Sequence, residues 1–210
     1  MTNSERLTSV IAKKFFLPQY IYTDLFVKND KQEKEFCDCI LEFESVYIVI
    51  QIKERGEKTT ITEEQWFEKK VIKTAKKQLK DTLEFYKDES NVIFSKSSVF
   101  VIDRAKTIIP VIVFLNANLP NYERVIRSKS LGDVINIFSY NDFETMLQTV
   151  ILPYDIVCYL QYRLMFENIV DGSIIADDVD DNTTVLFRPH TEQDFAQVFL
   201  ARNYYRDHKK

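Results

Sequence analysis

The alternation of hydrophobic and polar positions predicts a mixed α/β chain. Apolar residues at helical spacing predict a helix over residues 4–16, which Pro18 ends. Ile21–Val27 is rich in β-branched and aromatic residues and is expected to be extended, and residues 29–34 are expected to form a polar loop. Cys37–Phe43 and Val46–Lys53 are two strand-like runs separated by Glu44-Ser45, and the second is apolar enough to be a central strand.

The rest of the chain continues this mixture and then becomes helical. Glu63–Lys87 has the apolar spacing of one long helix, with Thr62 as its cap. Further strands are expected over 99–102, 109–115 and 134–138, the last of these being the last strand of the chain, and further helices over 141–150, 154–168 and 191–206. We therefore expect an α/β core over residues 1–139 and a helical, acidic extension over 140–210 packed on that core.

Composition excludes several functional classes. The chain has 210 residues but only three glycines, so it lacks the glycine-rich turns of dinucleotide-binding folds and P-loop NTPases. It has two histidines, and three cysteines too scattered for a zinc ribbon or a disulfide framework. No apolar run reaches the roughly 18 residues of a membrane span, and the first residues do not resemble a signal peptide. These features predict a cytoplasmic protein that is not bound to a membrane.

The net charge of −4 hides an asymmetry along the chain. Residues 53–106 carry thirteen lysines and arginines against ten acids, whereas residues 140–194 carry eleven acids against two arginines. Seven of the basic residues are lysines of the predicted helix 63–87. This helix is either an ordinary solvated surface or a contact for phosphates. The candidates for such a nucleic-acid contact are Lys73, Lys76, Lys77, Gln78 and Lys80.

The hairpin between Cys37 and Lys53 carries the most informative polar residues. A turn at Glu44-Ser45 pairs residues whose numbers sum to 89, which places Asp38 opposite Gln51, with Lys53 on the same face. An aspartate is disfavoured in so apolar a strand, and such local conflicts often mark functional sites. The alternative is an aspartate that only caps a turn. A carboxylate and an amide oxygen are suitable ligands for Mg²⁺, and the Ile52 carbonyl can complete part of the oxygen shell. Lys53 can stabilise charge on a phosphate.

These residues resemble the signature of the PD-(D/E)XK nuclease superfamily. Asp38, a hairpin, and then Gln51-Ile52-Lys53 are similar to its D…(E/Q)-x-K motif, in the glutamine form found in Mrr-like restriction enzymes. More narrowly, KEFCDCILEF followed by VYIVIQIK resembles an uncharacterised bacterial group of nuclease-like proteins, over about residues 4–167. The resemblance implies a restriction-endonuclease-like mixed sheet flanked by helices, built on an αβββαβ core.

The resemblance also implies an activity, which is Mg²⁺- or Mn²⁺-dependent hydrolysis of nucleic acid, DNA rather than RNA, in defence or DNA maintenance. Relatives often act as dimers, so a homodimer is a further expectation. The neutral Gln51 stands where an acid is common, so a second acid is expected from Glu5 on the first helix or from Glu35 before the strand. If neither acid reaches the site, the alternative is an inactive nuclease-fold module that binds nucleic acid or protein.

Overall fold

The structure is a computed structural model that describes residues 16, 18–28, 32–119, 121–128, 133–163, 174–176, 185–187 and 191–208. The chain divides into two compact units, residues 1–140 and 141–210. The predicted helix over 4–16 lies outside the described residues, apart from Phe16. No helix in the described ranges is long and apolar enough to cross a membrane.

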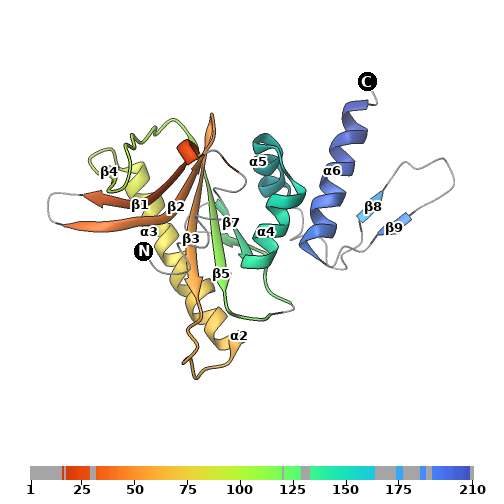
Figure 1. Ribbon diagram of the computed structural model, residues 1–210, viewed down its shortest axis with the longest axis horizontal. Coiled ribbons are helices and arrows are strands. Elements are labelled where there is room, and N and C mark those ends of the chain that lie inside the picture. The colour runs from red at the N-terminus through yellow and green to blue at the C-terminus, as the bar shows by residue number, and fades with distance from the viewer. Residues whose placement is uncertain are drawn as a thin grey trace. The chain divides into compact units, whose positions relative to one another are not determined.

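The first unit is built on a seven-stranded mixed sheet in the order β4-β1-β2-β3-β5-β7-β6 (Figure 1). Its strands are β1 (Ile21–Lys28), β2 (Glu33–Glu42), β3 (Val46–Glu54), β4 (Val92–Ser95), β5 (Thr107–Leu115), β6 (Val125–Ser128) and β7 (Asp133–Ser139). β1, β2 and β3 form an antiparallel meander, and β5 and β7 continue the sheet in parallel with β3. The predicted mixed α/β class is therefore confirmed at this level.

The central position of β3 is also confirmed. β3 lies between β2 and β5, and its residues from Val46 to Ile52 are all buried. Because a central strand is covered on both faces, its sequence shows no alternation between apolar and polar residues.

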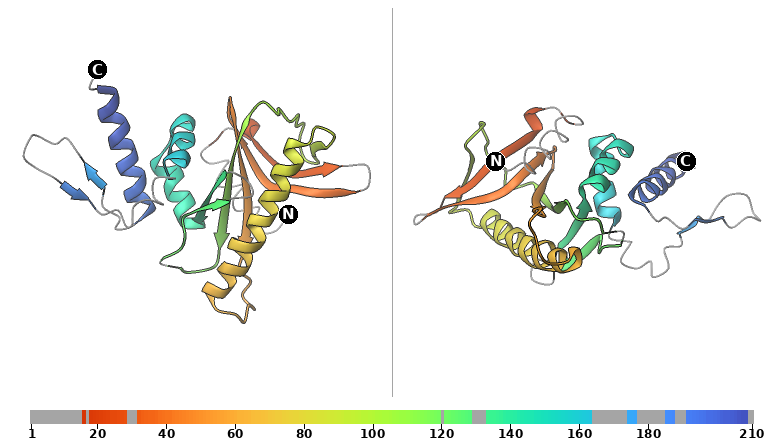
Figure 2. Two further views of the ribbon diagram at one scale, coloured as in Figure 1. Left: turned by 180° about the vertical axis from the view of Figure 1, so that it is seen from behind. Right: turned by 60° about the horizontal axis from the view of Figure 1, so that its bottom comes forward.

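The long helix follows β3 and is interrupted by a π-helical segment. It consists of α2 (Glu63–Trp66), η2 (Phe67–Ala75) and α3 (Lys76–Lys87). Thr62 caps its start as predicted, since its side chain accepts the Gln65 N–H while the Gln65 side chain accepts the Thr62 N–H. Seen from behind, the helix runs across one face of the sheet (Figure 2).

The π-helical segment keeps one side of this helix on the sheet. The buried residues Phe67, Val71, Ala75, Leu79 and Leu83 recur every four positions. With 3.6 residues per α-helical turn, a stripe of this period would rotate off the sheet. The wider i→i+5 turns of η2 rotate it back, so all five residues remain buried.

The segment after the helix differs from the prediction. β4 (Val92–Ser95) is the edge strand beside β1, whereas the predicted strand over 99–102 is wrong. Val99 and Val101 are 92% and 82% exposed, while Phe100 between them is buried against the rings of Tyr22 and Tyr47. The sequence alternates as a strand does, but here the alternation reflects one buried aromatic anchor in an irregular segment.

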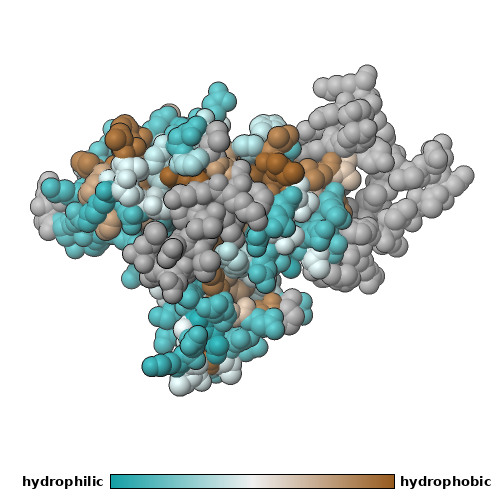
Figure 3. Space-filling model, in the orientation of Figure 1, coloured by the Kyte–Doolittle hydropathy of each residue, from teal (hydrophilic) through white to brown (hydrophobic). Residues whose placement is uncertain are grey.

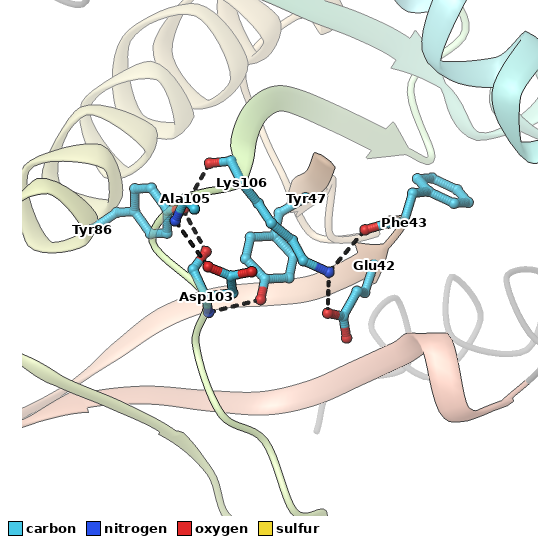
Figure 4. A network of polar contacts seen from close by, with 7 residues as sticks. All are labelled: Glu42, Phe43, Tyr47, Tyr86, Asp103, Ala105 and Lys106. Carbon is cyan, nitrogen blue, oxygen red and sulfur yellow. Dashed lines mark hydrogen bonds and ion pairs between the residues drawn. The ribbon is translucent and has the colours of Figure 1, made fainter. Parts of the chain in front are cut away.

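A polar network fixes the end of this irregular segment where β5 begins (Figure 4). The Tyr47 hydroxyl accepts the Asp103 N–H at 3.0 Å, and the Tyr86 hydroxyl lies 2.8 and 2.7 Å from the carbonyl oxygens of Asp103 and Lys106. The Lys106 ammonium binds the Glu42 carboxylate and the Phe43 carbonyl. Side chains or backbone groups of β3, of the end of α3 and of the β2–β3 hairpin turn thus all bind the short loop that precedes β5.

The second unit contains α4 (Tyr140–Thr149, which starts one residue before the boundary), α5 (Pro153–Tyr162), β8 (Ile174–Ala176), β9 (Val185–Phe187) and α6 (Glu192–His208). The three helices were predicted. The short β8–β9 hairpin was not, so β7 is not the last strand and this unit is not wholly helical. A fully buried ion pair at 3.0 Å joins Arg163, just after α5, to Glu192 at the start of α6. The Tyr159 hydroxyl donates to the same carboxylate at 2.6 Å.

Candidate hydrolytic site on the β2–β3 hairpin

The register of the hairpin is the one predicted from its turn. Four cross-strand pairs of β2 and β3 have residue numbers that sum to 89, from Glu42↔Tyr47 to Cys39↔Ile50. The ladder ends at Cys39↔Ile50. Beyond it β2 continues to pair with β1, while its other edge leaves β3. Asp38 is the first residue of β2 past this point of separation.

The Asp38 carboxylate replaces the missing backbone partner of β3. Its Oδ2 accepts the Ile52 N–H at 2.7 Å, which in a continuing ladder would pair with the backbone of Cys37. An accepted hydrogen bond occupies only part of a carboxylate, which has about four lone-pair sites. The carboxylate is therefore held in place at the end of the ladder.

Lys53 binds the same residue, Ile52, at its carbonyl group. Its ammonium donates to the Ile52 carbonyl oxygen at 2.8 Å. In an extended strand the N–H and C=O of one residue point to the same edge. The carboxylate of Asp38 and the ammonium of Lys53 are therefore gathered along the β2 edge of β3, around Ile52.

Gln51 directly precedes Ile52 in the sequence and is only 4% exposed. No hydrogen bond joins its amide to another residue in the part of the chain that the structure describes. Its amide atoms are not among the fully buried side-chain atoms that lack a partner, so the amide stays accessible to water or to a ligand. The predicted ligand set thus contains one carboxylate and one neutral amide. The third predicted ligand, the Ile52 carbonyl, is occupied by the Lys53 ammonium.

The expected second acid is not brought to the site by the described residues. Glu35 is an exposed residue of β2 and lies opposite Phe26 of β1, and Glu5 lies outside the described residues. Within the described ranges, no group of three or more His, Cys, Asp or Glu side chains is arranged to hold a metal ion.

Asp24 is an acid that the sequence analysis missed. The β1–β2 pairs on either side of it, Thr23↔Cys39 and Leu25↔Cys37, place it at the same level of the sheet as Asp38. Its φ of 53° is unusual for a non-glycine residue in a strand. Its signal was in the sequence, because Asp24 interrupts an apolar strand just as Asp38 does.

The neighbouring cysteines have no part in this arrangement. Cys37 and Cys39 are buried free thiols, as expected for small apolar residues. Burial raises the pKa of the Cys37 thiol well above its usual value, so the thiol stays protonated and unreactive.

The helix residues that the sequence predicts to contact nucleic acid differ in their exposure and in their ion pairs. Lys73 and Lys80 form exposed ion pairs, with Glu68 at 3.5 Å and Glu84 at 3.6 Å. Lys77 is exposed and Lys76 half-buried. The Oε1 atom of Gln78 is buried and accepts no hydrogen bond from a described residue.

Comparison of the chain with protein-family models, with curated proteins and with solved structures found no match.

Proposed function

We propose that this protein is a metal-dependent phosphodiesterase of the PD-(D/E)XK type that acts on nucleic acid, in defence or DNA maintenance. The observation that carries the proposal is the pair of contacts at Ile52, which gathers a carboxylate and an ammonium group at the end of a β-ladder. The order of elements also supports it, because the β1–β2–β3 meander, the long helix and the parallel strand β5 have the order of the βββαβ part of the expected core, with the edge strand β4 added between the helix and β5.

In this proposal each residue has one task. Asp38 and the Gln51 amide oxygen would hold Mg²⁺ or Mn²⁺, which would supply the positive charge that polarises a phosphate and lowers the pKa of water. Lys53 would stabilise the negative charge that develops on the phosphate during hydrolysis. For the Ile52 carbonyl to bind the metal as well, the Lys53 ammonium has to turn away from it towards the phosphate.

The second candidate function is an inactive nuclease-fold module that binds nucleic acid or protein. The neutral Gln51 favours it, because one carboxylate and one amide hold Mg²⁺ more weakly than two carboxylates do. Asp24 and Glu5 are the residues that would restore a second carboxylate.

Calorimetric titration with Mn²⁺ separates the two candidates. For the enzyme, we expect the wild-type protein to bind Mn²⁺, and Asp38→Asn to bind it at least tenfold more weakly. Lys53→Met should bind Mn²⁺ more tightly, on the order of tenfold, because it removes a positive charge next to the metal.

Asp88→Asn is the matched control, since Asp88 is an exposed carboxylate that already accepts hydrogen bonds from Ser90. It should bind Mn²⁺ as the wild type does. Absence of Mn²⁺ binding to the wild type, or equal binding by Asp38→Asn, would contradict the proposed metal site and leave the inactive module.

A further inference from the structure

The outer side of the long helix carries a continuous positive charge. The twelve residues from Lys69 to Lys80 contain six lysines and no acid, and acids stand only at the two ends of this run, at Glu68 and Asp81. Four of the lysines make no ion pair with any described residue; these are Lys69, Lys70, Lys76 and Lys77.

The π-helical segment aligns three of these lysines. Lys69, Lys73 and Lys77 each follow a buried stripe residue, Phe67, Val71 or Ala75, by two positions, which is about half a helical turn. They therefore lie on the side of the helix away from the sheet, and all three are exposed. Because the buried stripe stays straight, the three lysines form a straight row, which we call the lysine row, with a spacing of about 6 Å or less.

The ion pair within the lysine row does not neutralise it. Lys73 and Glu68 are 3.5 Å apart, with side chains 71% and 55% exposed. Exposed pairs of this kind contribute at most about 1 kcal/mol, so a phosphate can replace Glu68 at small cost.

The surroundings of the row favour nucleic acid over a lipid surface. A helix that binds a membrane surface needs an exposed apolar side to insert into the lipid. Here the apolar side is buried against the sheet, and Ile72, the remaining aliphatic residue between Lys69 and Lys80, packs against the same core. The outer side also has no exposed aromatic ring on which unpaired bases could stack, which favours a duplex over a single strand.

We infer that the lysine row binds the phosphate backbone of duplex DNA, independently of base sequence. This inference rests on the proposed function, from which it takes nucleic acid as the substrate, and it adds the form of the substrate and the surface that holds it. Contacts of lysine with phosphates are electrostatic, so each phosphate neutralised steepens the salt dependence of binding by roughly 0.9 in log–log slope.

The test is fluorescence anisotropy with a labelled DNA duplex in EDTA, over a series of KCl concentrations. Without metal there is no hydrolysis, so the result does not depend on whether the hairpin site is active. The triple variant Lys69→Gln, Lys73→Gln, Lys77→Gln should bind at least tenfold more weakly at low salt. Its log–log salt slope should fall by about 2 to 3.

A second triple variant with the same loss of charge is the control. It alters exposed lysines of β1, β2 and the loop after β3, namely Lys28→Gln, Lys34→Gln and Lys58→Gln. Its affinity should stay within twofold of wild type, and circular dichroism should show both variants folded. An equal loss in both triples would overturn the inference, since only net charge would then matter.

Two further ligands test the choice of partner. Single-stranded DNA of equal length should bind the wild type more weakly than the duplex does. Vesicles containing phosphatidylserine should not bind it. No binding of duplex by the wild type, or binding of vesicles that the lysine-row variant alone loses, would overturn the inference. Duplex binding without any cleavage would support the lysine row while contradicting the active site.

Discussion

Asp38 has a structural role that any test of its chemistry must separate from catalysis. Its carboxylate accepts the Ile52 N–H at 2.7 Å, so Asp38→Ala leaves a buried donor without a partner. We expect Asp38→Ala to lower the free energy of unfolding by roughly 1–3 kcal/mol. Asp38→Asn keeps an oxygen acceptor at the same position and should lose less than about 1 kcal/mol.

Urea unfolding of the two variants measures this difference directly. Similar stability losses in Asp38→Ala and Asp38→Asn would mean that the Ile52 contact does not hold the hairpin together. Because we expect Asp38→Asn to keep the fold, it is the suitable variant for measurements of metal binding and cleavage.

Tyr47 makes stability depend on alkaline pH. Burial raises the pKa of its phenol to about 12, whereas in the unfolded chain the phenol titrates near pH 10. The folded protein therefore keeps a proton that the unfolded protein releases. The stability that this group contributes is fully present below pH 10 and is lost as the pH rises to about 12.

We expect this loss to amount to at most about 2–3 kcal/mol between pH 10 and 12. We expect Tyr47→Phe to be less stable than wild type at neutral pH because the Asp103 N–H loses its acceptor. It should nevertheless lose less stability over the alkaline range than wild type does. Urea unfolding at pH 8, 10 and 11.5 measures this, and parallel losses in the two proteins would rule out Tyr47 as the cause.

The long helix combines two surfaces that substitutions can separate. Leu79 is fully buried in the stripe that faces the sheet, and Lys77, two residues earlier, is exposed. Leu79→Ala should cost 2–5 kcal/mol of unfolding free energy, through lost burial and the cavity left behind. Lys77→Ala should change it by less than about 0.5 kcal/mol.

Thermal or urea unfolding of the two single variants compares these surfaces on one element. A small effect of Leu79→Ala would contradict the description of the period-four stripe as the contact between helix and sheet. A large effect of Lys77→Ala would contradict its place on the outer side.

How far the elements follow from the sequence depends on how local their causes are. The Thr62 cap and the hairpin register were predictable, because a capping box and a two-residue turn are set by neighbouring residues. β4 and β6 were missed because a four-residue edge strand is defined by the strand that it pairs with, which lies far away in the sequence. The only sign of the π-helical segment in the sequence is that the apolar residues of the helix recur every four positions.

Only the local part of the candidate site was predictable from the sequence. The turn placed Asp38 level with Gln51, but the end of the β2–β3 ladder depends on how β2 follows β1 and has no signal in the hairpin itself. For that reason the contact from Asp38 to the Ile52 N–H was not foreseen. The hydrogen bond from the Lys53 ammonium to the Ile52 carbonyl was not foreseen either, because a long side chain can reach several nearby acceptors.

At the level of the whole molecule, the sheet and the helix place the two proposed functional surfaces on the first unit. The Ile52 region lies on a strand in the middle of the sheet, and the lysine row lies on the outer side of the helix that covers the sheet. The exterior around α2, at the bottom of the space-filling view, is mostly hydrophilic (Figure 3). A nuclease that cuts independently of base sequence would need both a surface that contacts the DNA phosphate backbone and a hydrolytic site.

The most direct measurement is cleavage of nucleic acid in Mg²⁺ or Mn²⁺ by wild type, Asp38→Asn and Lys53→Met. Plasmid DNA, linear duplex, single-stranded DNA and RNA should be compared in parallel, with Asp88→Asn as the folded control. We predict cleavage of duplex DNA by the wild type and the control, none in EDTA, and at least a hundredfold slower cleavage by both site variants. Equal cleavage by wild type and Asp38→Asn, or no cleavage of any substrate by the wild type, would contradict the hydrolytic site at Ile52.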